Sequence, residues 1–327
     1  MKGYTLDKVK GCLFGGAIGD ALGYVVEFDG YRFIVNVYGE KGITRFHRSP
    51  YAPLGGVSDD TQMTLFTATG LLEGSTRVKM EGDNDLRAWE KAVTRHYLDW
   101  KNTQVITKGP KAEHPSSWLY ALPELHERRA PGATCMNALA ALESGQKVNN
   151  NSKGCGGVMR VAPVALCRDL MDMPVSFVTT LGGTVAEVTH QHPLGFMPAA
   201  LMTDLLRRVM DSECENNKEN LKACVAAATE TVRKLYGFMY PGDWRVLKGL
   251  VDKAVELADE DLKDVEAIGQ LGEGWVGEEA LAIALYCALK HYDSFEDAVV
   301  AAVNHNGDSD STGAICGNLM GLVYGYD

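Results

Sequence analysis

Two short segments, one near each end of the chain, combine neighbouring carboxylates with hydroxyl groups. The first is GGVSDDT, from Gly55 to Thr61, and it runs into the apolar start of a helix. The second is NGDSDSTG, from Asn306 to Gly313, which also leads into a helix. Such residues can cap a helix, because they accept backbone N–H bonds and suit the helix dipole. One acid would suffice for a cap, so two acids in each segment also indicate a metal site.

The four aspartates of these segments favour a hard cation. Their ligand atoms would all be oxygen, which suits Mg²⁺ or Mn²⁺ and disfavours zinc. An EF-hand calcium loop is excluded, because Gly313 and Leu319 stand in the wrong places for its glycine and its bidentate glutamate. Four acids that met without cations would repel one another, so their convergence requires one or two divalent ions. The spacing along the chain does not establish that the two segments meet.

Four further features allow two interpretations each. Glu27 follows a glycine-rich helix and is either an exposed acid at its end or part of a site. The turn SKGCGGVMR, from Ser152 to Arg160, is either an ordinary turn or a cradle of backbone N–H groups for phosphate. In THQHP, His190 is either a polar lining residue or a metal ligand. Trp275 in GEGWVG is either a core anchor or a stacking platform for a base.

The elements that must position these residues are helices. Helical periodicity dominates and no run of alternating strand residues stands out, so we predict one all-α domain over residues 1–327. The predicted helices cover 5–22, 60–73, 85–101, 117–127, 133–143, 174–189, 195–210, 218–236, 243–257, 277–290, 294–304 and 311–324.

Two of these helices carry glycines four residues apart. The first has Gly11, Gly15, Gly19 and Gly23, and the last has Gly313, Gly317 and Gly321. Each glycine inside a helix costs about 1 kcal/mol relative to alanine, so close packing must offset the loss. Spacing by four places the glycines on one face, where backbones can approach closely. We therefore predict that both helices are central and tightly packed, with each other as the candidate partner.

Composition restricts the classes of function. The net charge of −11 argues against general affinity for nucleic acid or for anionic membranes. It leaves room for one small anionic nucleotide, because a cation and backbone amides supply a local positive field. We expect neither a membrane span nor a secretory signal. Eight cysteines without a CxxC pair predict reduced, mostly buried thiols and a cytoplasmic location. The sequence does not predict an oligomeric state.

Taken in order, the motifs resemble the ADP-ribosylglycohydrolase family, which includes the dinitrogenase reductase-activating glycohydrolase and the ADP-ribosylarginine hydrolases. The resemblance runs almost from end to end and rests on GCLFGGAIGDALG with Glu27, GGVSDDTQM, APGATC, SKGCGGVMRVAP, VTHQHP, GEGWVGEEALAIALY and GDSDSTGAICGNLMG. It implies an all-α fold and a glycohydrolase with two Mg²⁺ or Mn²⁺ ions in a cleft. The implied substrate is an ADP-ribosylated protein or a small ADP-ribosyl compound.

The resemblance also implies roles for residues of this chain. The implied metal ligands are Ser58, Asp59, Asp60, Asp308, Asp310 and Ser311. Glu27 and Asp60 are the implied catalytic acids, one of which deprotonates the attacking water. The implied substrate-binding residues are Ser152, Gly154, Gly156, Gly157, His190 and Trp275. Ser58 and Ser311 stand where the family more often has threonine, and Cys155 stands where asparagine is common.

Three alternatives concern the reaction itself. Arginine-, serine- and acetyl-linked ADP-ribose are all candidate substrates, and general likeness to the activating glycohydrolases favours arginine. A two-metal phosphoesterase that cuts the diphosphate would use similar groups. A non-catalytic ADP-ribose-binding relative is the third possibility, and the intact acidic set argues against it.

Overall fold

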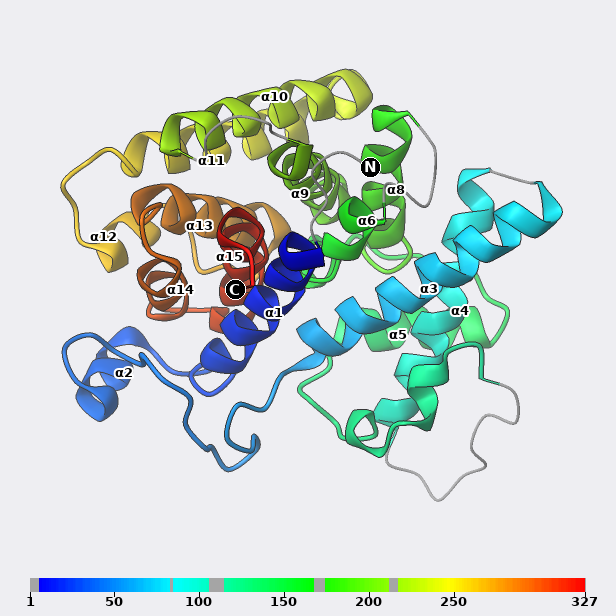
Figure 1. Cartoon of the computed structure of the whole chain (residues 1–327), viewed down its shortest axis with the longest axis horizontal. Coiled ribbons are helices and arrows are strands. Elements are labelled where there is room, and N and C mark those ends of the chain that lie inside the picture. Colours follow the sequence, from blue (N-terminus) through cyan, green and yellow to red (C-terminus); the bar gives the residue numbers. More distant parts are fainter. Residues whose placement is uncertain (1–5, 83–84, 106–114, 168–173, 212–216, 327) are drawn as a thin grey trace.

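The computed structural model describes residues 6–82, 85–105, 115–167, 174–211 and 217–326, and the regular elements in these ranges are helices (Figure 1). Two isolated bridge pairs are the only β-type pairing in these ranges, so the predicted all-α fold is confirmed. The α-helices are α1 (Leu6–Gly23), α2 (Tyr31–Tyr38), α3 (Asp59–Glu81), α4 (Leu86–Gln104), α5 (Ala133–Glu143), α6 (Ala162–Leu166), α8 (Val175–Glu187), α9 (Pro193–Asp211), α10 (Lys218–Tyr236), α11 (Pro241–Leu257), α12 (Asp264–Ile268), α13 (Gly277–Lys290), α14 (Phe295–Val303) and α15 (Ser309–Tyr324). Short 3₁₀ helices are η1 (Trp118–Ala121), η2 (Pro123–Leu125) and η3 (Cys155–Gly157).

The first and last helices pack side by side in the middle of the fold, as the blue and red ribbons of Figure 1 show. Their glycines face each other across the interface. A Cβ atom added at Gly15 would overlap the carbonyl oxygen of Gly317, and one added at Gly19 would overlap that of Gly313. The prediction that both glycine-bearing helices are tightly packed is confirmed, and each is the other's partner. Because this pair joins the two ends of the chain, it brings the two acidic segments into one region.

One predicted helix is wrong. Residues 117–127 form the two short 3₁₀ helices η1 and η2 instead of one α-helix. Pro123 has no N–H to donate and its ring disfavours helical geometry in the residue before it. Leu122 accordingly adopts extended dihedral angles, with φ −86° and ψ 114°.

Other differences concern short helices and helix lengths. The sequence reading missed α2, α6 and α12, which span only five to eight residues and therefore show too few turns for periodicity to stand out. Helix α3 continues to Glu81, eight residues beyond its predicted end, and stops at Gly82 in a left-handed conformation.

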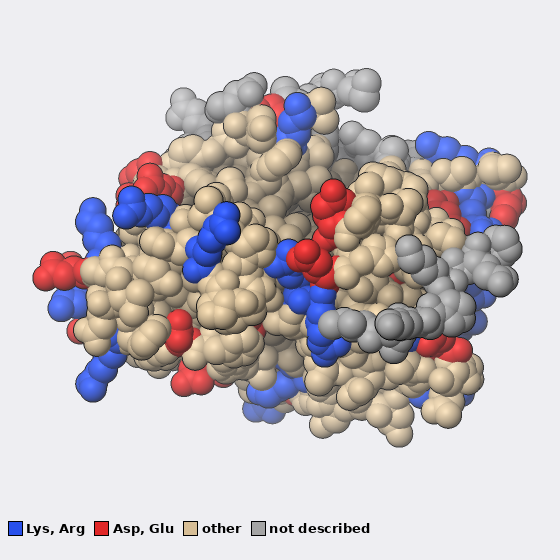
Figure 2. All heavy atoms as spheres, turned by 90° about the horizontal axis from the view of Figure 1, so that it is seen from below, with Lys and Arg blue, Asp and Glu red and all other residues tan. Residues whose placement is uncertain are grey.

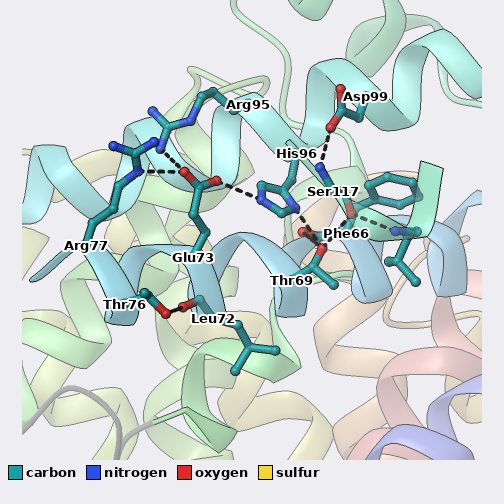
Figure 3. A network of polar contacts seen from close by, with 11 residues as sticks. Phe66, Thr69, Leu72, Glu73, Thr76, Arg77, Arg95, His96, Asp99 and Ser117 are labelled. Atoms are coloured by element: carbon teal, nitrogen blue, oxygen red, sulfur yellow. Dashed lines mark hydrogen bonds and ion pairs between the residues drawn. The ribbon is translucent and has the colours of Figure 1, made fainter. Parts of the chain in front are cut away.

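A polar network fastens α3 to α4 (Figure 3). The Glu73 carboxylate of α3 accepts hydrogen bonds from Arg77 Nε at 2.6 Å and Arg95 Nη2 at 2.7 Å, and it pairs with His96 Nε2 at 2.9 Å. The other ring nitrogen of His96 lies 2.8 Å from the Thr69 hydroxyl, which donates to the Phe66 carbonyl. We interpret this as a structural connection that holds the long helix α3 in place, and with it the acidic residues at its N-terminus.

The surface carries charges of both signs. Figure 2 shows groups of neighbouring acidic and basic side chains on one face, with broad uncharged areas between the groups. Inside the fold, Cys12, Cys135, Cys287 and Cys316 are buried thiols, as predicted, whereas Cys214 lies outside the described residues. None of the described helices combines the length and apolar character needed to cross a bilayer.

Candidate active site

The first acidic segment is held in place by an aspartate in the interior of α1. The Asp20 carboxylate, fully buried, accepts the backbone N–H of Ser58 at 2.9 Å and that of Thr61 at 3.0 Å. The Thr61 hydroxyl donates to the same carboxylate. Asp20 therefore fixes the first turn of α3 against α1.

Within this turn the three predicted ligands have different surroundings. Ser58 is the N-cap of α3 and accepts the N–H of Asp60 at 3.2 Å. Asp59 accepts the N–H of Gly132 at 3.2 Å. Asp60 is only 3% exposed, and its Oδ2 atom has no hydrogen-bond partner among the described residues. The segment thus caps the helix and still presents a carboxylate oxygen without a partner.

The second acidic segment is also a cap with spare oxygens. Asp308 is the N-cap of α15, and the N–H of Ser311 donates to Asp308 Oδ1 at 3.3 Å and to Asp310 Oδ1 at 2.8 Å. All three side chains are buried. The capping interpretation and a site are therefore compatible in both segments.

Glu27 joins the two segments. Its side chain is 9% exposed, so it is not an exposed acid at the end of a helix. One carboxylate oxygen from each of Glu27, Asp308 and Asp310 lies within 4.8 Å of the others. Asp59 and Asp60 line the same cavity, which has a volume of about 210 Å³. The structure therefore brings carboxylates from both ends of the chain around one space.

Burial and mutual repulsion change the acidity of these groups. Burial, followed by the charges of Asp308 and Asp59, raises the pKa of Glu27 to about 9. Burial also raises the pKa of Asp59 to about 8. The pKa values of Asp60 and Asp310 are raised well above the usual range, again through burial first and neighbouring carboxylates second. Without a cation, burial and mutual repulsion therefore disfavour the ionised forms of Glu27, Asp59, Asp60 and Asp310.

The donor set fits a hard divalent cation. In the part of the chain that the structure describes, Glu27 Oε2 and Asp60 Oδ2 are buried without a hydrogen-bond partner, and such oxygens carry an energetic cost that a bound cation removes. The side chains that line the cavity include five carboxylates and two hydroxyls, and oxygen atoms of these kinds are the ligands that Mg²⁺ and Mn²⁺ prefer. Cys155 adds one thiol, whose Sγ lies 2.8 Å from Asp308 Oδ2.

The glycine-rich turn forms one wall of the cavity. Gly154 pairs with Val276 in an isolated bridge, and the N–H of Cys155 donates to the Trp275 carbonyl at 3.2 Å. Gly154 and Gly156 line the cavity. Gly157 packs behind the turn, where an added Cβ would lie 2.6 Å from the Gly195 carbonyl oxygen. Close backbone packing thus explains Gly157, whereas Gly154 and Gly156 have no side chain that would project into the cavity.

An aromatic pair and a histidine complete the lining. Trp275 is 40% exposed, so it is not a core anchor, and its ring stacks on Phe28 with centroids 6.3 Å apart. His190 is buried, and burial followed by the charge of Arg160 lowers its pKa to about 3. A neutral imidazole therefore faces the cavity at neutral pH.

Most of the predicted site residues meet at this cavity. Its lining includes Glu27, Asp59, Asp60, Gly154, Gly156, His190, Trp275, Asp308, Asp310 and Ser311. Ser58, Ser152 and Gly157 are not among its lining residues: Ser58 is the buried N-cap of α3, and the Ser152 hydroxyl accepts the N–H of Gly154 at 3.4 Å. The sequence reading gave no role to Asp20, although an acid inside an apolar, glycine-rich helix was a usable signal. It also gave no role to Ala130 and Gly132, which line the same cavity.

Comparison with known proteins gives matches that extend along nearly the whole chain. The family model described as ADP-ribosylglycohydrolase matches residues 1–327. ADP-ribosylhydrolase ARH3 of Mus musculus is 23% identical over 345 residues, which cover 99% of this chain and 85% of that protein. The ADP-ribosyl-[dinitrogen reductase] glycohydrolase of Rhodospirillum rubrum is 23% identical, over 98% of this chain and 87% of that protein.

A solved structure described as an ADP-ribosylglycohydrolase-related protein complex has the same fold. Its TM-score is 0.62 at 22% identity, and the match covers 98% of this chain and 88% of that one. The match of the family model along the whole sequence is the decisive comparison. This chain belongs to the ADP-ribosylglycohydrolase family.

Proposed function

We propose that this protein is a divalent-cation-dependent hydrolase of the glycosidic bond between ADP-ribose and a modified protein side chain, with arginine as that side chain. The observation that carries the proposal is the meeting of Glu27 with Asp308 and Asp310 at a cavity that Asp59 and Asp60 also line. A ring of carboxylates suits a glycosidic reaction, because its transition state resembles an oxocarbenium ion.

Two Mg²⁺ or Mn²⁺ ions would be held by the side chains of Ser58, Asp59, Asp60, Asp308, Asp310 and Ser311. When bound, such ions supply Lewis-acid polarisation and orient the hydroxyls of a ribose. Ser58 now caps α3 through its hydroxyl, which accepts the N–H of Asp60, so its oxygen has one further lone pair for a cation. The unpartnered Oδ2 of Asp60 is the oxygen best prepared to act as a ligand.

The chain's own acids move the protons. Glu27 and Asp60 border the cavity, and burial raises the pKa of both carboxyls in the metal-free protein. One accepts a proton from the attacking water, and an acid protonates the leaving group. His190 stays neutral and provides a polar edge for the ligand. Gly154 and Gly156 leave room for the diphosphate and ribose, and Trp275 forms part of the nucleotide wall.

The choice of arginine rests on general likeness to the activating glycohydrolases, and the R. rubrum ADP-ribosyl-[dinitrogen reductase] glycohydrolase is similar to nearly the whole chain. A panel of defined substrates tests it: peptides with arginine-linked or serine-linked ADP-ribose, and O-acetyl-ADP-ribose, each assayed with a chelator and with added Mg²⁺ or Mn²⁺. We expect release of free ADP-ribose from the arginine-linked substrate only when the cation is present. Preferred cleavage of the serine-linked or acetyl-linked substrate would reject arginine but keep the glycohydrolase.

The identity of the product separates the proposal from its rivals. Free ADP-ribose supports a glycohydrolase, whereas AMP with a ribose phosphate would identify a phosphoesterase that cuts the diphosphate. A calorimetric titration that detected no Mg²⁺ or Mn²⁺ binding would instead favour a non-catalytic ADP-ribose-binding relative.

A further inference from the structure

A completely buried arginine lies behind the wall of the candidate active site. The guanidinium of Arg160 donates from Nη2 to the Thr189 hydroxyl at 2.7 Å and to the Val185 carbonyl at 3.2 Å. It also stacks over the ring of Tyr97, with its Cζ atom 4.5 Å from the ring centroid. The hydrogen-bond partners that the described residues supply to this cation are neutral, so its field acts on nearby polar groups.

Thr189 transmits this interaction to the cavity. Its hydroxyl oxygen accepts from Arg160, and among the described residues its single hydrogen has two possible nitrogen or oxygen acceptors. His190 Nδ1 is 2.8 Å away, whereas the Ala186 carbonyl oxygen is 3.4 Å away. The shorter distance favours donation to Nδ1. The opposite arrangement would direct a ring N–H at an oxygen that already receives an N–H from a cation, which is electrostatically unfavourable.

A neutral imidazole whose Nδ1 accepts a hydrogen bond carries its proton on Nε2. The Nε2 edge of His190 faces the glycine turn: a Cβ added at Gly154 would lie 3.2 Å from Nε2, and one added at Gly156 would lie 2.8 Å from Cε1. His190 and both glycines line the cavity that contains the carboxylates. The two glycines thus leave the ring edge open to a ligand.

We propose that Thr189, held by Arg160, is a positioning residue that fixes His190 as an Nε2–H donor to an oxygen acceptor of the bound ligand. With the proposed function, on which this part rests, the acceptor is a ribose or phosphate oxygen of the ADP-ribosyl group. A neutral N–H donor orients the ligand by a directional hydrogen bond. The negative charge of the ligand would then be neutralised by the cations. Burial among neutral groups and beside Arg160 keeps the imidazole uncharged, since its pKa is lowered to about 3.

The tautomer is measurable without substrate or metal. In the full-length protein labelled with ¹⁵N at histidine, long-range proton–nitrogen spectra distinguish the Nε2–H from the Nδ1–H form, and the signal missing in His190→Gln identifies His190. We expect the Nε2–H form in the wild type and in Thr189→Ser, which keeps the hydroxyl. We expect a mixture or the Nδ1–H form in Thr189→Val, which has nearly the same shape. An Nδ1–H wild type overturns the proposal, and so does an unchanged tautomer in Thr189→Val.

Calorimetry with ADP-ribose in the presence of Mg²⁺ tests the consequence for binding. We expect Thr189→Val to bind about 5- to 10-fold more weakly, the equivalent of one hydrogen bond, and Thr189→Ser to bind like the wild type. Equal affinity of all three would overturn the role in positioning. If the wild type has the Nε2–H form, Thr189→Val loses it, and no variant binds ADP-ribose, the link from Thr189 to His190 stands and the proposed function fails. Should Thr189→Val not fold, the wild-type tautomer still decides.

Discussion

The carboxylate of Asp20, in the interior of α1, accepts the backbone N–H of Ser58 at the start of α3 at a distance of 2.9 Å. The same carboxylate accepts the N–H of Thr61 at 3.0 Å. The buried Asp20 carboxylate thus accepts hydrogen bonds from the first turn of α3, where Asp59 and Asp60 are located. Asp20 therefore positions the candidate metal-binding residues without having to contact the cation itself.

Asp20→Asn should weaken cation binding and turnover without unfolding the protein. The amide nitrogen would be a donor where the native carboxylate oxygen accepts hydrogen bonds from Ser58 and Thr61, so the first turn of α3 should shift. Loss of an outer support of this kind costs about 10- to 100-fold in metal affinity or activity. Titration with Mn²⁺ and an assay of ADP-ribose release measure the two effects. Wild-type values for both would show that Asp20 is only a buried structural acid.

Asp60→Asn and Asp310→Asn should each remove turnover while the helical circular dichroism spectrum stays unchanged. Each replaces a carboxylate that faces the cavity with a poor cation ligand, and the loss should exceed about 100-fold. Asp297→Asn is the matched control, because Asp297 is an exposed acid in the first turn of α14. Near-wild-type activity in either cavity variant would contradict a cation-dependent reaction at this site.

The metal-free protein should become less stable as the pH rises. Folding raises the pKa of Asp59 from 3.8 to about 8 and that of Glu27 from 4.5 to about 9, so between these limits the folded state binds more protons than the unfolded state. Stability that is present below about pH 4 is therefore lost progressively up to about pH 9. Chelator-treated protein should melt at a higher temperature near pH 5.5 than near pH 8.5.

Addition of Mg²⁺ or Mn²⁺ should reverse this trend, because the cation binds the ionised carboxylates of the folded state. The double variant Glu27→Gln, Asp59→Asn should flatten the dependence without added cation. A melting temperature of the metal-free wild type that climbs between these two pH values would contradict the raised acidities.

Gly317→Ala should destabilise the fold by about 1–3 kcal/mol or more, since even one methyl group would overlap the Gly15 carbonyl. Gly15→Leu and Gly317→Leu should be more severe. Gly249→Ala is the matched control: Gly249 lies on the exposed side of α11, where an added Cβ meets nothing within 4 Å. There alanine should raise stability by about 0.5–1 kcal/mol. Denaturant unfolding measures the stability of all four variants, and thermal melting provides a second measurement. Wild-type melting temperatures for both leucine variants would reject the close helix contact.

The sequence by itself determined the features that depend on near neighbours in the chain. Periodic apolar residues defined the long helices, so α5, α10 and α13 have the bounds predicted for them. Glycines four apart identified α1 and α15 as closely packed helices, because a bare helix face is worthwhile only where another backbone approaches it. The types and spacing of the acidic residues likewise indicated oxygen ligands for a cation.

Only the tertiary structure decided what depends on residues far apart in the chain. The contact of α1 with α15 brings Glu27 to Asp308 and Asp310, and no local pattern encodes that meeting. The tertiary structure also decides that Glu27 is buried and that Trp275 is partly exposed. It places Gly157 behind the glycine-rich turn, whereas Gly154 lines the cavity. The reason is physical: periodicity records which face of an element is apolar, whereas burial and acidity depend on which other elements cover that face.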